Sequence, residues 1–142
     1  MVTLIESLIR RNCVTINEDE QISEIFSLLK QHNIGCLIVT SKKNRALSGI
    51  VSERDLVRNF NDIYLGKSSK VKDIMTKKVI SCAMNSTSKD IMKIMTVNKI
   101  RHLPIIDDNN KLKGIISIGD VVNRVISKYE EETRLLKEYI NS

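Results

Sequence analysis

Several residue types are scarce in this chain of 142 residues. Tryptophan is absent, proline occurs once, and the aromatic residues are three tyrosines and two phenylalanines. A surface for single-stranded nucleic acid usually combines clustered lysines and arginines with stacking rings. Here the basic residues are scattered along the sequence, so the net charge of +6 indicates a solubilising surface. Nucleic acid is not an expected partner.

Long hydrophobic runs are also missing. No stretch approaches the roughly 18 consecutive apolar residues that a membrane span needs. Residues 1–11 lack both a long apolar stretch behind a basic start and a small-residue cleavage site, so no secretory signal is predicted. We expect a cytoplasmic protein with no membrane partner. The matrix of an organelle is the alternative, if a transit peptide has been removed.

Cysteine and histidine are too few and too widely spaced for a metal site or a catalytic centre. Cys13, Cys36 and Cys82 form no C-x-x-C pair, and neither His32 nor His102 lies at zinc-finger spacing from a cysteine pair. The cysteines are expected to be reduced and buried in or beside strands. With no Gly-x-Ser-x-Gly and no clustered carboxylates, no nucleophile–base pair is evident. We therefore predict that this chain is not an enzyme and that it contains no catalytic residue and no metal ligand.

The sequence does contain an internal repeat. The segment 49–57, Gly-Ile-Val-Ser-Glu-Arg-Asp-Leu-Val, returns at 114–122 as Gly-Ile-Ile-Ser-Ile-Gly-Asp-Val-Val. Both copies contain Ser-x-x-Asp, as Ser52 with Asp55 and as Ser117 with Asp120. The repeat predicts two halves that share one order of elements.

Each half is predicted to fold as β-α-β-β-α. A short apolar strand precedes a polar, capping-rich stretch and an amphipathic helix; a hairpin and a second helix follow. The amphipathic helix of the first half, which follows an N-terminal helical segment, is expected to bury Ile22, Ile25, Phe26 and Leu29. The predicted strands are 13–16, 36–40, 47–51, 79–82, 103–106 and 112–117, with second helices starting at Glu53 and Ile118.

Two further segments lie outside this pattern. Residues 59–70 are polar and are predicted to be an inter-repeat linker. The last helix continues far past the repeat, with Val122, Ile126, Tyr129, Leu136 and Ile140 roughly on one face. Such a helix either packs on a partner subunit or covers its own core.

These motifs resemble the CBS domain pair, or Bateman module, named after cystathionine β-synthase. Besides the tandem Ser-x-x-Asp, Val-Lys-Asp-Ile-Met-Thr at 71–76 and Arg-His-Leu-Pro-Ile-Ile-Asp at 101–107 are typical. The resemblance covers about residues 13–124 and is strongest to stand-alone two-module proteins of bacteria and plant organelles. It implies an α/β (α+β) fold with modules at 1–65 and 66–142 about a pseudo-twofold axis. It also implies two ligand clefts and a disc-like homodimer.

The paired serine and aspartate suit a nucleotide chemically. An ionised carboxylate at a helix start accepts two hydrogen bonds from the vicinal hydroxyls of a ribose, each contributing about 1.5–3 kcal/mol. A serine there adds a hydroxyl near backbone N–H groups that favour phosphate. Serine and aspartate are also ordinary helix-capping residues, which is the alternative interpretation.

The resemblance further implies that each cleft combines the Ser and Asp of one half with the first strand and the helix end of the other. One predicted cleft contains Asp120, Ser117, Thr15, Ile16, Cys36 and Ile38. The other contains Asp55, Ser52, Ile80, Ser81, Arg101 and His102. The last two are expected to reach phosphates. Because Gly35 and Cys36 stand where the second half has Arg101 and His102, the clefts should differ.

The expected function is regulatory. The chain is predicted to bind an adenosine-containing ligand, with AMP favoured over ADP, ATP, NAD or S-adenosylmethionine, and to convey energy status to a regulated enzyme partner. The alternative is a ligand-independent protein-interaction module, with nucleic-acid binding a less favoured third.

Overall fold

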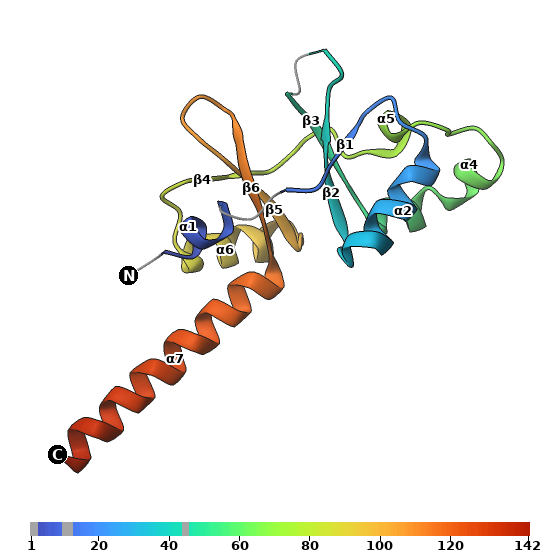
Figure 1. Ribbon diagram of the computed structural model, residues 1–142. Helices are drawn as coiled ribbons and strands as arrows, with labels where there is room; N and C mark the ends of the chain where they lie inside the picture. Colours follow the sequence, from blue (N-terminus) through green and yellow to red (C-terminus); the bar gives the residue numbers. More distant parts are fainter. Residues whose placement is uncertain (1–2, 10–12, 44–45) are drawn as a thin grey trace.

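The computed structural model describes residues 3–9, 13–43 and 46–142, and it contains the predicted element order twice (Figure 1). The first half consists of β1 (Thr15–Asn17), α2 (Ile22–His32), β2 (Cys36–Thr40), β3 (Leu47–Ser52) and α3 (Glu53–Arg58). The second consists of β4 (Cys82–Ala83), α6 (Ser88–Asn98), β5 (His102–Ile106), β6 (Leu112–Ser117) and α7 (Ile118–Asn141). Three further helices are α1 (Leu4–Ile9), α4 (Phe60–Tyr64) and α5 (Val71–Ile74).

The two halves build sheets of the same topology. The strand orders are β1-β2-β3 and β4-β5-β6; in each sheet the first pair is parallel and the second pair antiparallel. Both hairpins shift register at equivalent places, between Val39 and Thr40 and between Ile105 and Ile106. The predicted mixed α/β class with tandem β-α-β-β-α units is therefore confirmed.

Helix α2 shows how its sequence selects its buried face. Ile22, Ile25 and Leu29 are buried, as their spacing predicts, and the helix ends at Asn33, whose left-handed backbone (φ 52°) returns the chain toward β2. The inclusion of Phe26 in the buried stripe was wrong, because its side chain is 52% exposed. It lies at the edge of the stripe and lines a hollow toward α3 instead of the sheet.

Each half has its own hydrophobic core. One helix of each core comes from the part of the chain that is assigned, by sequence position, to the other half. Val71 and Ile74 of α5 pack with the first half, although they follow the predicted boundary at 65/66. Ile5 and Leu8 of α1 pack with the second half, although they begin the chain. The rest of the first core is Ile16, Ile22, Ile25, Leu29, Leu37, Val39, Val51 and Leu56; that of the second is Cys82, Ile91, Met95, Leu103, Ile105, Ile116 and Val121.

The opposite face of strand β2 is covered as well. Leu37 and Val39 point into the first core, so Cys36 and Ile38 point to the other face of the sheet. Ile38 is nevertheless 0% exposed. A second layer therefore covers this face, and the contact between the halves includes a hydrogen bond from Arg54 Nη1 to the Lys99 carbonyl at 3.2 Å.

Three expectations about element bounds need correction. Residues 59–70 contain helix α4, in which Phe60 and Tyr64 stack with ring centroids 6.0 Å apart, and are not purely a linker. The first strand is 15–17, where it can pair with β2, and not 13–16. The strand expected at 79–82 is reduced to Cys82–Ala83, the two residues that pair with β5.

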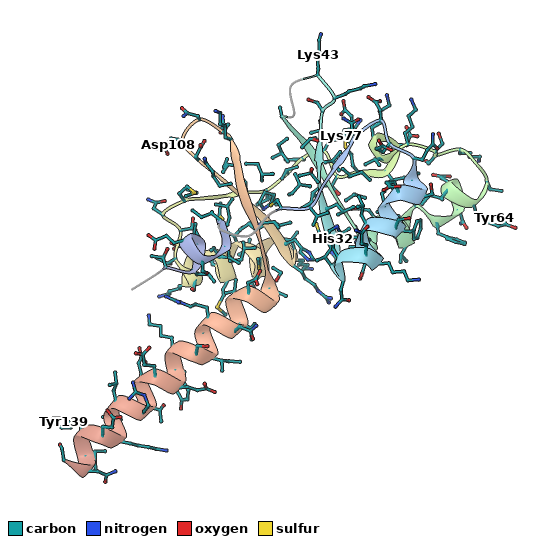
Figure 2. The ribbon with its side chains drawn as sticks, in the orientation of Figure 1. His32, Lys43, Tyr64, Lys77, Asp108 and Tyr139 are labelled. Carbon is teal, nitrogen blue, oxygen red and sulfur yellow. The ribbon has the colours of Figure 1, made fainter. Side chains whose placement is uncertain are left out.

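The last helix extends well beyond the second half, and Tyr139 lies near its far end (Figure 2). All residues of α7 are described, and only Val121 is buried. No helix in the described ranges is long and apolar enough to cross a membrane.

Candidate functional site

The first repeated Ser-x-x-Asp sits where β3 ends and α3 begins. The backbone N–H and the hydroxyl of Ser52 both donate to Asp55 Oδ2, at 2.9 and 3.2 Å. The Thr76 hydroxyl donates to Asp55 Oδ1 at 3.2 Å. Both carboxylate oxygens of Asp55 therefore accept hydrogen bonds within the chain.

The second copy repeats this arrangement between β6 and α7. The N–H and hydroxyl of Ser117 each donate to Asp120 Oδ2 at 2.9 Å, and the Asp120 N–H donates to Ser117 Oγ at 3.2 Å. This is a capping box, which satisfies backbone N–H groups at a helix start. The capping interpretation is thus confirmed at this position, while the ribose interpretation stays a prediction.

Backbone hydrogen bonds hold both helix starts against the turn before the central strand of each sheet. The Glu53 N–H donates to the Gly35 carbonyl at 3.0 Å, and the Ile118 N–H donates to the Arg101 carbonyl at 2.8 Å. The ladder consequently places Cys36 opposite Ser52 in the first half, and His102 opposite Ser117 in the second.

These two ladder neighbours differ in chemistry. Burial lowers the pKa of His102, an effect that the carboxylates of Glu53 and Asp120 oppose and Arg101 reinforces. The neutral imidazole is therefore favoured, with one donor and one acceptor nitrogen. Burial, with smaller contributions from Asp55 and Cys13, raises the pKa of Cys36 to about 12, so this thiol stays protonated. It is not a nucleophile at neutral pH.

Of the other two cysteines, Cys82 is buried as predicted, whereas Cys13 is not fully buried. Burial outweighs a hydrogen bond with Ser86, which lowers the pKa of Cys82, and the net pKa of this thiol is raised to about 11. Cys36 and Cys82 are buried, Cys13 is half-buried, and none of the three is in a disulfide.

The predicted site residues differ widely in accessibility. The exposed ones are Thr15, Ile80 and Arg101; the half-buried ones are Ser52, Asp55, Ser81, His102, Ser117 and Asp120; the buried ones are Ile16, Cys36 and Ile38. Ile16, Cys36 and Ile38 are 4%, 5% and 0% exposed as whole residues, so a ligand can contact Ile38 only if the packing opens.

The structure groups some of these residues within one half. Cys36 lies beside Ser52 and Asp55, and His102 lies beside Ser117 and Asp120. Glu53, at the start of α3, is close enough to influence His102, so the two helix starts face the same region. The predicted assignment of Cys36 and His102 to clefts with the opposite half's aspartate stays a prediction.

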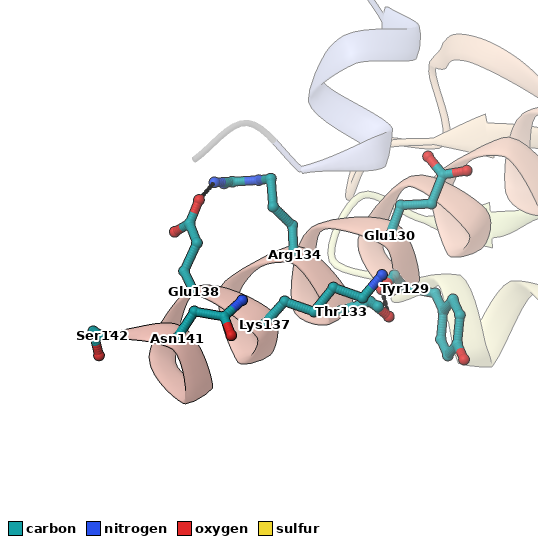
Figure 3. Close-up of a pocket in the computed structure, with 8 residues that line it drawn as sticks. All are labelled: Tyr129, Glu130, Thr133, Arg134, Lys137, Glu138, Asn141 and Ser142. Atoms are coloured by element: carbon teal, nitrogen blue, oxygen red, sulfur yellow. Dashed lines mark hydrogen bonds and ion pairs between the residues drawn. The ribbon is translucent and has the colours of Figure 1, made fainter.

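Two hollows on the surface lie elsewhere. One of about 420 Å³ runs between α2 and α3 and is lined by Phe26, Leu29, Lys30, Asn33, Ile34, Glu53, Leu56 and Val57. The other, about 710 Å³, is a shallow region along the outer part of α7 (Figure 3). Neither includes any of the predicted site residues. In the parts of the chain that the structure describes, no three His, Cys, Asp or Glu side chains gather as a metal site.

Sequence reasoning missed Thr76 as a neighbour of Asp55. Residues Ile50 and Thr76 exchange backbone hydrogen bonds of 3.0 and 2.8 Å, which bring the segment after α5 against β3. A Cβ on Gly49 would lie 2.7 Å from the Thr76 carbonyl oxygen, so only glycine permits this approach without a shift. The Gly at the start of the repeat was the one available signal, but its counterpart Gly114 has no such neighbour.

Comparison with known sequences places this architecture in a family. The sequence model described as "CBS domain" matches twice, at residues 5–62 and 71–127. The chain belongs to the CBS domain family. The two matches correspond to the two halves, which are tandem CBS domains.

Its relatives include stand-alone CBS proteins. The CBS domain-containing protein CBSX3, mitochondrial, of Arabidopsis thaliana is 39% identical over 128 residues, covering 86% of this chain and 61% of CBSX3. This chain therefore spans about three fifths of that relative. The CBS-domain containing protein ATU1752 from Agrobacterium tumefaciens is 39% identical with a TM-score of 0.76, covering 87% of this chain and 93% of that structure.

A second similar structure was solved with a nucleotide. CBSX2 in complex with AMP is 25% identical with a TM-score of 0.77, covering 91% of this chain and 99% of CBSX2. The tandem CBS fold is thus shown for this chain, and an adenosine ligand is shown for a relative of the same fold.

Proposed function

We propose that this tandem CBS protein is a regulatory module without catalytic activity that binds an adenosine-containing ligand and modulates a partner protein. The observation that carries the proposal is the duplicated Ser–Asp pair, half-buried at two equivalent helix starts that face one region of the molecule. AMP is the favoured ligand; ADP, ATP, NAD and S-adenosylmethionine are the alternatives.

The geometry supports ribose recognition at these positions. A carboxylate oxygen can accept more than one hydrogen bond, so a ribose hydroxyl can add to or replace those from serine. At Asp55, a ribose hydroxyl that donates to Oδ1 has to bind this oxygen together with the Thr76 hydroxyl or displace that hydroxyl from it. The exposed Arg101 and the neutral His102 supply donors for a phosphate, and the influence of Glu53 on His102 supports their predicted place in the cleft of Asp55. The AMP complex of CBSX2 supports the same ligand class.

The chemistry of His102 supports a role other than catalysis. It lies opposite Ser117, yet the Ser117 hydroxyl donates its hydrogen to Asp120. An activated serine nucleophile would instead donate to the imidazole. The histidine therefore fits binding of a polar ligand group and not activation of a serine.

The partner and the assembly belong to the same proposal. We expect a disc-like homodimer in which ligand binding favours one packing of the halves, and this shift in population conveys energy status to an enzyme. Its expected location is the cytoplasm. An organelle matrix is the alternative, which the mitochondrial name of CBSX3 supports.

A second candidate is a ligand-independent docking module. The observation that favours it is that Asp55 and Asp120 already cap their own helices through Ser52 and Ser117. A purely structural role for both pairs would leave no charged group committed to a ribose.

Thermal unfolding of the purified chain separates the two candidates. AMP, ADP, ATP, NAD, NADH, S-adenosylmethionine, GMP and a short RNA are tested in turn. A ligand at 100 times its dissociation constant stabilises the native state by about 2.7 kcal/mol, which raises the midpoint by several degrees. A shift with adenosine compounds and none with GMP supports the sensor. No shift with any of them favours the docking module, and a shift with RNA alone contradicts both.

A further inference from the structure

Helix α7 presents an apolar seam that nothing in the described structure covers. The helix begins at Ile118, contributes Val121 to the second core and continues to Asn141 (Figure 1). Beyond Val121 its apolar side chains are exposed, and those on one face are between 42% and 70% exposed: Val122, Ile126, Tyr129, Leu136 and Ile140. Exposing such an apolar face on an isolated helix is unfavourable in water. We therefore expect another protein surface to cover it.

The spacing of this face identifies the kind of occupant. With Thr133 included, the positions 122, 126, 129, 133, 136 and 140 are separated alternately by four and three residues. That is the heptad spacing of a left-handed two-helix coiled coil, in which these positions form the a and d seam. Five of the six seam positions are apolar, over three heptads.

The remaining positions after Val122 are mostly polar, with Val125, Leu135 and Tyr139 as exposed exceptions. Arg134 and Glu138 form an ion pair of 2.7 Å within the helix, and Figure 3 shows them pointing away from Tyr129 and Thr133. The Thr133 hydroxyl donates to the Tyr129 carbonyl at 2.9 Å, so its polar group is satisfied inside the helix and only its methyl needs burial. A single polar residue in a seam is tolerated and helps to fix the register.

We propose that the seams of two copies of this chain pair as a parallel, in-register coiled coil. The charges that flank the seam select this occupant and orientation. In a parallel pair, Glu132 of each copy lies beside Lys137 of the other, which gives two attractive contacts. An antiparallel pair that uses the whole seam would bring Glu130 against Glu130 and Glu132 against Glu132. An antiparallel pair shifted by one heptad avoids this repulsion but leaves Val122 and Ile126 without partners.

This contact is separate from the disc-like dimer and does not depend on nucleotide binding. It uses α7 from Val122 onward, most of which lies beyond the second CBS match at 71–127, whereas the proposed disc is formed by the two CBS domains. Three heptads make a short coiled coil, so its affinity alone is modest and the association depends on protein concentration.

Site-specific cross-linking of the full-length chain tests the pairing. In L136C the new thiols face each other across a parallel seam, so mild oxidation should yield a covalent dimer. L135C is the matched control, because Leu135 is 50% exposed in the same helix but lies outside the seam. Cross-linking of L136C well above L135C and wild type supports the proposal. Equal yields, or none, overturn it.

Sedimentation velocity gives an independent measurement. L136E should weaken the self-association of the 142-residue chain about tenfold or more relative to L135E. The pairing would bury the introduced carboxylate in the seam and place it against the same carboxylate of the second copy, which repels it. E132K should also weaken self-association, because two positive charges then face each other across the pair. E132K/K137E should restore self-association, because the charges are again opposite. Equal effects of L136E and L135E, or no restoration, overturn the proposal. AMP-induced thermal shifts measured on the same variants report separately on the proposed function.

Discussion

At the scale of single residues, Gly49 and Gly114 occupy the same place in the two repeats but have different surroundings. An added Cβ at Gly49 would meet the Thr76 carbonyl at 2.7 Å and Met75 Sδ at 3.0 Å. At Gly114 the nearest atom would be 3.7 Å away, which is an ordinary contact. We predict that Gly49→Ala lowers the free energy of unfolding by about 1–3 kcal/mol, whereas Gly114→Ala changes it by less than about 0.5 kcal/mol.

Urea denaturation followed by circular dichroism measures both variants. The pair is its own control, since the same methyl group is added at equivalent strand positions. Similar losses in the two variants would show that the close approach of Thr76 to β3 is not what requires glycine at position 49.

The ribose role of the aspartates is tested by removing charge. We predict that Asp55→Ala or Asp120→Ala lowers the affinity for the adenosine ligand about tenfold or more, since hydrogen bonds to a charged group contribute about 1.5–3 kcal/mol. Titration calorimetry with AMP measures the affinity. Asp108→Ala is the control, because Asp108 lies exposed in the β5–β6 turn. Unchanged affinity in both aspartate variants contradicts the ribose assignment and leaves the carboxylates as helix caps.

At the scale of elements, α6 depends on a capping box with Thr87 and Asp90. The Asp90 N–H donates to Thr87 Oγ1 at 3.1 Å, and the Thr87 N–H donates to Asp90 Oδ2 at 3.0 Å. We predict that Thr87→Ala lowers the free energy of unfolding by about 1 kcal/mol, while Thr87→Ser, which keeps the hydroxyl, retains most of it. Chemical denaturation of both variants at neutral pH gives the comparison, and equal loss in both rules out the hydroxyl as the cause.

The same cap implies a pH dependence. The backbone and side-chain hydrogen bonds from Thr87 lower the pKa of Asp90 below its usual value of 3.8. Its contribution to stability is therefore fully present above pH 3.8 and is lost as the pH falls through the lower folded-state pKa. The difference in stability between wild type and Asp90→Asn should shrink below pH 4 and stay constant above it.

The sequence predicted the elements well wherever local pattern and partner strands agreed. The bounds of β2 and β6 and the starts of α2, α3 and α7 are as expected, because apolar periodicity and capping residues coincide there. The first strand of each half was misplaced because its bounds depend on how many residues pair with β2 or β5. Helix α4 was missed because it has only five residues, too few for its apolar side chains at Phe60, Ile63 and Tyr64 to establish a helical period.

The site was less predictable than the fold. The repeat identified both Ser–Asp pairs, and the structure places them at helix starts as expected. It could not reveal that Thr76 occupies Asp55 Oδ1, because this contact joins residues 21 positions apart through a bridge with no local signal. The burial of Ile38, which depends on what covers the far side of β2, is likewise a tertiary property.

At the scale of the whole molecule, the exchange of α1 and α5 makes each half incomplete when it is cut from the other. Residues 66–142 lack Ile5 and Leu8, which are 2% and 5% exposed within the second core. Residues 1–65 lack Val71 and Ile74 of the first core. Loss of a large buried side chain costs about 2–5 kcal/mol, and a domain of this size has about 5–15 kcal/mol in total.

We therefore predict that fragment 66–142 alone does not unfold cooperatively, and that a peptide of residues 1–13 supplied in trans restores a thermal transition. The peptide with Ile5 and Leu8 changed to serine is the control, since it keeps the length and charge but not the apolar face of α1. Calorimetry of the fragment with each peptide measures the effect. A cooperative transition of the fragment alone, or equal rescue by both peptides, would show that the second core is complete without α1. The boundary at 65/66 would then divide the molecule in space as well as in sequence. Rescue by the native peptide alone would instead mean that the two CBS domains fold as one cooperative unit. A change of packing in one half would then alter the stability of the core in the other.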